Sequence, residues 1–404
     1  MSVVSELNPP LVPPAEIAAR TARFQARLSA QGLPLAVISH PVDLYYLTGT
    51  MPDGWLIVPA AGRPELLVRK SLSRARSESP LDDVRPFLGI RGLADELLVR
   101  LGDGATNVGL DLDVLPAATF LRLQALLPAY RWIDSGPLIR QIRAVKSAWE
   151  VERHRRAARQ YLATFQAIRD NLREGTTELE LSSLAEAAMR REGHQGLVRF
   201  RRSGMELWFC LVGTGLGPSY PTAFDGPVGS DGLHPASGPV AGRRPIRRGV
   251  PVMADIVGNH EGYHADIARL FCLGEPPDEL KRAHDFCRTA LRRIENLMRP
   301  GTPCDEIHRE ISAWAKAQGE PEGFMGYGEN RVKFFGHGIG LELDEYPIIA
   351  GGFTLALEPG MVLAVEPKAF YPELGPAGLE MCYVITEQGP EPLLDYPEEI
   401  QLVP

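Results

Sequence analysis

The sequence lacks the features that mark secreted, membrane-spanning and nucleic-acid-binding proteins. Only five of its 404 residues are cysteine, an odd number with no CxxC pair, which argues against a disulfide framework. No apolar run approaches the ~20 residues that a membrane-spanning helix requires, and the N-terminus has no signal-peptide pattern. The net charge of −8 leaves no basic footprint for nucleic acid. We therefore expect a cytoplasmic protein without a membrane or nucleic-acid partner.

What the sequence does contain, near its N-terminus, is an alternation of strand and helix patterns. A Pro-rich arm over residues 1–14, which we expect to be flexible, precedes residues 15–140, which predict an α/β domain. The expected elements are a helix over Ile17–Gln31, a strand over Leu35–His40, a hairpin over Gly54–Arg69, a helix over Ala94–Leu101, a strand over Asn107–Asp113 and a helix over Ala117–Leu127. We expect Ile139–Ser147 to be a linker, followed by a long helix over Ala148–Asn171. The second domain then spans residues 141–404.

The second domain carries an internal repeat. The segment LREGTTELEL, which begins at Leu172, resembles MRPGTPCDEI, which begins at Met298. Three pairs of residues have the same spacing of 126 positions: Gly175 and Gly301, Glu180 and Glu306, and Gly193 and Gly319. In each copy a helix ends before a Gly-Thr turn that can cap the next helix. The repeat predicts two αα-ββ halves that enclose a central site.

A long Gly/Pro-rich stretch lies between the two copies, over Leu216–Gly249. Loops of this length without their own secondary structure are uncommon unless they carry function. Because the stretch comes just before the first candidate ligand strand, we expect it to form a wall or lid of the site.

Five potential metal ligands stand in short contexts in the last third of the chain. They are Asp255 and Asp266 in VMADIVGNHEGYHADIARLF, His337 in FFGHGIGLELDEYP, Glu366 in LEPGMVLAVEP, and Glu380 in GPAGLEMCYVITEQGP. Four carboxylates offset the charge of two dications, and an oxygen-rich set with one nitrogen suits Mn²⁺, Co²⁺ or Zn²⁺. Two such ions about 3.5–4 Å apart can turn a shared water into a nucleophile.

Each candidate ligand also has an alternative, a structural role without metal. Asp255 and Asp266 fit adjoining strands of one hairpin. Because Asp is depleted in strands, two aspartates there indicate a functional role; the alternative is a surface hairpin whose polar residues face outward. His337 lies in an expected turn between two glycines, which allow close backbone approach; the alternative is a structural histidine. Glu366 and Glu380 interrupt apolar strands, and a buried carboxylate there must be paired or metal-bound.

These five contexts, in this order, resemble those of the pita-bread metallopeptidases: prolidase, aminopeptidase P and methionine aminopeptidase, with metal-free creatinase as a relative. The resemblance covers residues from about Lys146 to the C-terminus, and a weaker one covers the N-terminal part. It implies an α+β pita-bread catalytic domain with a pseudo-twofold repeat, preceded by a smaller α/β creatinase-like domain that forms a homodimer. It also implies two divalent ions, Mn²⁺ foremost.

The resemblance implies roles for individual residues as well. Asp255 chelates one ion, Asp266 and Glu380 bridge both, and Glu366 holds one and shuttles the proton. His337 is the remaining ligand. A substrate-facing histidine often precedes the first Asp in these peptidases, and His234 is the candidate for that catalytic role.

The substrate-facing positions depart from the peptidase pattern. Asp344 stands where a second histidine is usual, Gly378 where an Arg is frequent two residues before the last Glu, and Ala268 where a Thr is common. Metal chemistry is therefore better supported than a preference for proline.

The expected function is hydrolysis of Xaa-Pro bonds in dipeptides or short peptides by a metal-bridging hydroxide. The alternatives are a metal-dependent hydrolase or lyase of a non-peptide small molecule, and a non-catalytic binding scaffold on the same fold.

Overall fold

The computed structural model describes residues 10–404, and the chain folds as two compact units, Met1–Ile142 and Arg143–Pro404. Residues 1–9 of the expected flexible arm lie outside the described residues, and its last residue, Pro14, begins the first helix. Within the described part of the chain, no helix is both long enough and apolar enough to cross a membrane.

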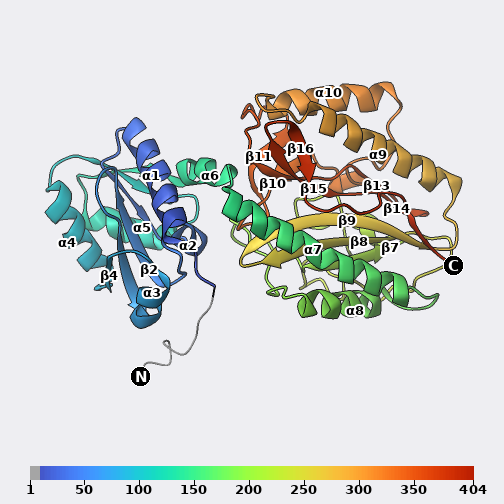
Figure 1. The fold of residues 1–404 in the computed structure, drawn as a ribbon, viewed down its shortest axis with the longest axis horizontal. Coiled ribbons are helices and arrows are strands. Elements are labelled where there is room, and N and C mark those ends of the chain that lie inside the picture. The colour runs from blue at the N-terminus through green and yellow to red at the C-terminus, as the bar shows by residue number, and fades with distance from the viewer. Residues whose placement is uncertain (1–9) are drawn as a thin grey trace. The chain divides into compact units, whose positions relative to one another are not determined.

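The first unit is built around one mixed sheet with the strand order β4-β3-β2-β1-β5-β6 (Figure 1). Its strands are β1 (Leu35–Ile38), β2 (Asp53–Pro59), β3 (Glu65–Lys70), β4 (Asp83–Pro86), β5 (Asn107–Leu110) and β6 (Arg131–Asp134). Its helices are α1 (Pro14–Ala30), α2 (Pro41–Thr48), α3 (Leu72–Glu78), α4 (Gly89–Leu101) and α5 (Ala117–Leu126), with α6 (Gly136–Ala144) at the end of the unit. The predicted alternation is confirmed, and β2 and β3 form the predicted antiparallel hairpin.

The second unit contains four long helices and the strands that carry the candidate ligands. Its helices are α7 (Ala148–Asn171), α8 (Glu178–Arg191), α9 (Asp278–Leu297) and α10 (Cys304–Ala317), with short 3₁₀ turns η2 (Gly217–Ser219) and η3 (Gly328–Asn330). Its strands are β7 (Cys210–Thr214), β8 (Val252–His260), β9 (Tyr263–Leu273), β10 (Phe334–Gly338), β11 (Glu345–Ala350), β12 (Val362–Val365), β13 (Lys368–Tyr371), β14 (Gly375–Gly378), β15 (Met381–Thr386), β16 (Gly389–Pro392) and β17 (Gln401–Val403). They form sheets in the orders β17-β9-β8-β7, β11-β10-β12-β15-β16 and β13-β14.

The internal repeat appears as two helix pairs with matching bounds. α9 ends 126 positions after α7, and both ends of α10 lie 126 positions after those of α8. The turn glycines Gly175 and Gly301 both have positive φ, 85° and 89°. The repeat extends to the strands, because Gly249 precedes Asp255 by six residues and Gly360 precedes Glu366 by six, and both glycines again have positive φ.

The central strand β12 is buried on both faces, which explains its wholly apolar sequence. Successive residues of a strand point to opposite faces. On β12, Val362 and Ala364 pack into the apolar cluster under α7 and α8, whereas Leu363 and Val365 pack into the cluster under α9 and α10. The sheet therefore separates the two halves of the core, and its strand ends place side chains between them.

The segment Ile139–Ser147, expected to link the domains, contains the boundary between the two units, and its first part belongs to helix α6. One local expectation is wrong. His337 lies within β10 and not in a turn. His264, which flanks the hairpin turn, is fully buried, and its ring bonds the Gly340 carbonyl and the Asn259 side chain.

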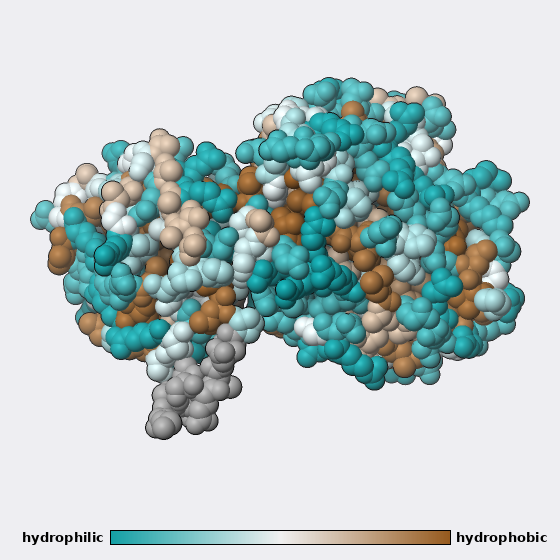
Figure 2. Space-filling view, viewed as in Figure 1, coloured by the Kyte–Doolittle hydropathy of each residue, from teal (hydrophilic) through white to brown (hydrophobic). Residues whose placement is uncertain are grey.

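The face shown in Figure 2 is mostly hydrophilic, with hydrophobic residues scattered over it. On the outer helices of the second unit, Leu162 of α7 and Leu184 of α8 are exposed singly. Isolated apolar residues of this kind are normal on protein surfaces, so the helices α7 and α8 show the ordinary outer face of a packed layer.

Candidate metal centre

The β8–β9 hairpin places the two aspartates on one face. Asp255 lies opposite Ala268, and Asp266 lies opposite Val257. Cross-strand partners share a face, and so do residues two apart on one strand. The two carboxylates therefore point to the same side of the sheet, in a diagonal arrangement.

His337 comes from β10, which is clamped between two strands. β10 pairs with β12, so that His337 faces Ala364, and with β11 on its other side. A Cβ at Gly336 would lie 2.4 Å from the Ala364 carbonyl oxygen, and one at Gly338 would lie 2.1 Å from that of Tyr346. The two glycines thus serve close strand packing, which fixes the histidine between its neighbours.

The two glutamates stand at strand ends. Glu366 directly follows β12, and its backbone N–H donates to the Phe335 carbonyl at 3.0 Å. Glu380 directly precedes β15 and exchanges backbone hydrogen bonds with Ala268 of β9 at 3.1 and 3.3 Å. These bonds bring the second-half glutamate against the hairpin that carries the aspartates.

Two buried side chains hold this junction of β9 and β15. Arg269 donates to backbone carbonyls, including that of Glu380 at 2.7 Å. The Cys382 sulfur accepts from the Asp266 N–H and its thiol donates to the Asp266 carbonyl, both at 3.1 Å. The backbone at Asp266 and Glu380 is therefore fixed from two sides.

The ring of His337 is oriented for binding through its Nε2 atom. Its Nδ1 lies 3.0 Å from the Gly338 carbonyl oxygen and must carry the proton to donate there. Asp344 lies on the same side of the ring, 3.6 Å from Nδ1. Nε2 then keeps a free lone pair, and it faces Glu366 at 4.0 Å.

Three of the five residues form a cluster that could hold a metal ion. Ligand atoms of Asp266, His337 and Glu380 all lie within 4.8 Å of one another. Asp266 Oδ1 and Glu380 Oε1 are buried, and neither has a hydrogen-bond partner among the described residues. Buried carboxylate oxygens without a partner must be neutralised by a cation or by a proton, and their grouping with the His337 imidazole fits a divalent ion.

A lysine that the sequence analysis did not single out lies in the middle of the cluster. The Nζ atom of Lys368 is 2.7 Å from Asp255 Oδ2, 2.9 Å from Glu366 Oε2 and 2.5 Å from Glu380 Oε2. Lys368 is 1% exposed. A signal for it was present in the sequence, because it follows Glu366 by two residues and so shares its face in an extended chain.

Burial and mutual repulsion shape the electrostatics of the cluster. Burial raises the pKa of Asp266 well above its usual range, and the nearby Glu380 and Asp255 carboxylates raise it further. Burial likewise raises the pKa of Glu380, which Lys368 opposes. Burial alone would lower the pKa of Lys368, but the Asp255, Glu366 and Glu380 carboxylates raise it well above its ordinary value. The negative charge of the buried carboxylates therefore favours a bound cation at this site.

All five predicted ligands line one pocket. The Gly/Pro-rich stretch contributes Phe224 to Val228, so it forms a wall as expected. The remaining lining is mainly apolar, with Asp225 and Asp344 as its acidic members outside the ligand set. Lys368 is the only basic residue of the lining besides His337.

His234 is not brought to this pocket. It is exposed, its Nδ1 accepts from the Ala236 N–H at 3.1 Å, and it lines a separate hollow. The expectation that it faces the substrate is therefore corrected by its position, since the loop carries it away. Asp344, which stands where a second histidine is usual, does line the pocket.

The loop that carries Asp344 is anchored by a buried ion cluster. The Arg143 guanidinium contacts Glu345 at 2.5 Å and Glu342 at 2.8 Å, and Lys146 contacts Glu345 at 3.3 Å. Burial works against the charge of Glu345, but Arg143 and Lys146 outweigh it and lower its pKa to about 2. This cluster fixes the GHGIGLELDEYP segment beside the start of α7.

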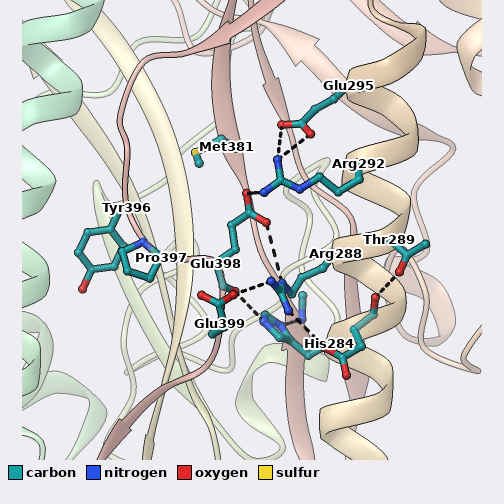
Figure 3. Close-up of polar contacts among 12 residues, drawn as sticks. His284, Arg288, Thr289, Arg292, Glu295, Met381, Tyr396, Pro397, Glu398 and Glu399 are labelled. Atoms are coloured by element: carbon teal, nitrogen blue, oxygen red, sulfur yellow. Dashed lines mark hydrogen bonds and ion pairs between the residues drawn. The ribbon is translucent and has the colours of Figure 1, made fainter.

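A second network supports the hairpin of β13 and β14 from α9, as Figure 3 shows. His284 Nδ1 accepts from the Gly378 N–H at 3.2 Å, so its Nε2 carries the proton and donates to the Glu398 carbonyl at 2.8 Å. Arg292 pairs with the Glu398 carboxylate at 2.7 Å. The C-terminal segment is thereby tied to the backbone next to Glu380.

Comparison with known proteins agrees with this architecture. The model of metallopeptidase family M24 matches residues 152–387, and that of the creatinase/prolidase N-terminal domain matches residues 20–145. The chain is 28% identical to a probable dipeptidase PepE of Mycobacterium tuberculosis (96% of this chain, 98% of the relative). It is 26% identical to an Xaa-Pro dipeptidase of Lactobacillus delbrueckii subsp. lactis (95% and 98%).

Solved structures give the same result. The crystal structure of dipeptidase PepE from Mycobacterium ulcerans has a TM-score of 0.80 at 27% identity, covering 98% of this chain and 100% of that one. The prolidase from Pyrococcus horikoshii has a TM-score of 0.78 at 20% identity, covering 95% and 99%, and supports the pita-bread fold alone. The chain belongs to metallopeptidase family M24, with a creatinase/prolidase N-terminal domain ahead of its catalytic unit.

Proposed function

We propose that this chain is a metal-dependent peptidase that hydrolyses short peptides, with Xaa-Pro dipeptides as the first substrates to test. The observation that carries the proposal is the convergence of four carboxylates and the His337 imidazole in one buried pocket. The names of the relatives, dipeptidase and Xaa-Pro dipeptidase, support the substrate class. A divalent ion in such a site polarises a carbonyl oxygen and makes a bound water a nucleophile near neutral pH.

The protein groups have separate tasks in this proposal. His337 is held in one tautomer by the Gly338 carbonyl, and Asp266 and Glu380 present buried oxygens that lack partners among the described residues. Glu366, at the pocket wall, is the proposed proton carrier between the attacking water and the leaving amine. The apolar lining excludes bulk water, which strengthens every charge interaction inside.

The charge of the lining favours a particular kind of substrate. Asp225 and Asp344 can receive a free amino group, whereas no arginine lines the pocket and Lys368 is already bound to three carboxylates. A dipeptide carboxylate would have no free cation in the lining. This supports a second candidate, a metal-dependent hydrolase of an amine-bearing amide whose far end is neutral.

The test is release of product from a panel of substrates by protein loaded with Mn²⁺, Co²⁺ or Zn²⁺. The panel contains Xaa-Pro dipeptides, their C-terminal amides and longer peptides. Cleavage of the free dipeptides supports the first candidate, and cleavage only of the amides or longer peptides supports the second. Metal binding without any cleavage would contradict both peptide substrates, and failure to bind any of the three ions would contradict the metal-dependent function.

Four further expectations stay predictions. They are two metal ions sharing a bridging hydroxide, manganese as the physiological ion, a homodimer formed through the N-terminal domain, and a cytoplasmic location. Metal analysis of protein purified from its native source tests the second, and analytical ultracentrifugation tests the third.

A further inference from the structure

The Lys368 ammonium occupies a position among the carboxylates that a metal ion would otherwise take. It makes contacts of 2.5–2.9 Å with Asp255, Glu366 and Glu380, the lengths of charge-assisted hydrogen bonds. An ammonium has three donors, and here each has a carboxylate partner. The cation is therefore fully coordinated by residues expected to be metal ligands.

We propose that Lys368 is a built-in cation of the centre, which replaces one of the two expected divalent ions. The remaining ion then binds to Asp266, His337 and Glu380, and the centre holds one ion per chain. This inference rests on the proposed metal-dependent function and refines it.

Space is the first argument for replacement. A divalent ion bound to carboxylate oxygens lies roughly 2.0–2.2 Å from each of them. An ion bound to the same oxygens of Asp255, Glu366 and Glu380 would fall within the volume of the Nζ atom. The ammonium and the ion therefore exclude each other, and two cations so close would also repel strongly.

The lysine is held where it is by its backbone. Lys368 opens β13, opposite Gly378 of β14, and its carbonyl accepts from the Met325 N–H at 2.8 Å. The strands pass so closely that a Cβ at Gly378 would lie 2.5 Å from the Lys368 Cα. Because the backbone is fixed and the side chain is 1% exposed, leaving the cluster would strand a charged group in the protein interior.

The unpartnered atoms identify the position that remains. Glu380 uses Oε2 for Lys368, while its Oε1 and Asp266 Oδ1 have no partner among the described residues. The His337 Nε2 faces the same cluster. The oxygens are thus divided between one resident ammonium and one open cation position.

The formal charges agree with this division. One dication with the ammonium leaves four carboxylates with a single excess negative charge, whereas two dications with the ammonium leave an excess positive charge. A single negative charge is complementary to the amino group of a substrate that enters beside Asp225 and Asp344.

The experiment counts metal ions per chain in the full-length protein. Wild type, Lys368→Ala, Lys368→Arg and the exposed-lysine control Lys333→Ala are equilibrated with Mn²⁺ and with Co²⁺, and bound metal is measured by elemental analysis and calorimetry. We expect one ion in wild type, in Lys368→Arg and in the control, and two in Lys368→Ala. Electron paramagnetic resonance should show isolated Mn²⁺ in wild type and an exchange-coupled pair in Lys368→Ala.

The outcomes separate this inference from the proposed function. Two ions in wild type would overturn the inference and leave the metal-dependent function standing. One ion in both wild type and a folded Lys368→Ala would show that the lysine does not exclude the second ion, which also overturns the inference. No ion in wild type would contradict both. If Lys368→Ala does not fold, Lys368→Ser, which is also small and uncharged, takes its place with the same two outcomes.

Discussion

The two halves of the catalytic unit share one architecture but differ in how the strands that carry the candidate ligands are connected. In the first half, β8 and β9 carry Asp255 and Asp266 and run together to a tight turn at His260 and Tyr263. In the second half, Glu366 and Glu380 are separated by the extra hairpin of β13 and β14.

The two halves differ most clearly at the position two residues after their first carboxylate. In the first half this residue is Val257, which packs in the apolar core, and in the second half it is Lys368. Both lie eight positions after the matching glycines, Gly249 and Gly360. The repeat thus supplies four carboxylates symmetrically, and the asymmetric hairpin supplies the one ammonium. The duplicated architecture therefore places the four carboxylates, and the hairpin present only in the second half places an ammonium among them.

The largest effect should come from changing a carboxylate that has a buried oxygen without a partner among the described residues, as Asp266 and Glu380 do. Asp266→Asn and Glu380→Gln keep the size of the side chain but lose its charge. We expect each to lower metal affinity and turnover by at least about 100-fold, since even residues that merely orient ligands cost 10–100-fold. Metal content and product release measure this. The control, Asp255→Asn, removes a partner of Lys368 and should leave the bound ion in place; equal metal loss in the control would contradict the division of the carboxylates between the ammonium and the ion.

The next effect concerns the hairpin that exists only in the second half. Gly378 has φ 100°, and a Cβ there would lie 2.4 Å from the Pro367 carbonyl oxygen. Gly378→Ala should lower the free energy of unfolding by about 2–5 kcal/mol, from the left-handed backbone and the overlap together. Gly301→Ala, at φ 89° with open space around it, should cost only about 1–2 kcal/mol. Chemical denaturation measures both, and equal losses would mean that the close approach to Lys368 is not rigid.

These effects show what local sequence could and could not predict. That the five candidate ligands come together was predictable from the resemblance of their short contexts to the family, and the hairpin of Asp255 and Asp266 was predictable from its strand pattern. The bounds of α7 were predictable from its capping residue Ser147 and its helical pattern. The repeat was visible because its turn glycines keep one spacing.

The failures have physical causes of the same kind. The glycines beside His337 suggested a turn, but they serve the close packing of β10 between two strands. His234 was misplaced because a long loop has no periodicity from which to take a register. Lys368 was overlooked because its spacing from Glu366 places the two on one face only if the chain stays extended through Pro367, which the sequence does not show.

A smaller effect should follow from a feature that the two halves share. In the first half, His194 accepts from the Gly196 N–H at 2.9 Å and donates to the Val257 carbonyl at 3.0 Å. In the second, His284 does the same between Gly378 and Glu398. Burial lowers the pKa of each to about 4. Both bridges therefore require a neutral ring.

The pH dependence follows from these directions. Above pH 6.5 the two histidines are mostly neutral in both the folded and the unfolded chain. Between pH 6.5 and pH 4 they take up protons only in the unfolded chain, so the free energy of unfolding decreases as the pH is lowered. From pH 7.5 to pH 5 each should cost about 2 kcal/mol. His284→Gln and His194→Gln should each flatten this decline when urea midpoints are compared at the two pH values. A decline unchanged in both variants would place the titrating groups elsewhere.

The smallest effect tests how the repeated helices begin. Thr177 caps α8: its hydroxyl accepts from the Glu180 N–H at 3.2 Å, and the Glu180 carboxylate accepts from the Thr177 N–H at 2.8 Å. Pro303, 126 positions later, precedes α10 without a side-chain cap. Thr177→Ala should therefore lower the free energy of unfolding by about 1 kcal/mol, while Pro303→Ala should cost less because no capping bond is lost. Urea denaturation at pH 7.5 measures both. If Pro303→Ala costs as much as Thr177→Ala, then the fixed backbone of proline, and not a hydroxyl cap, is what the second half uses to start its helix.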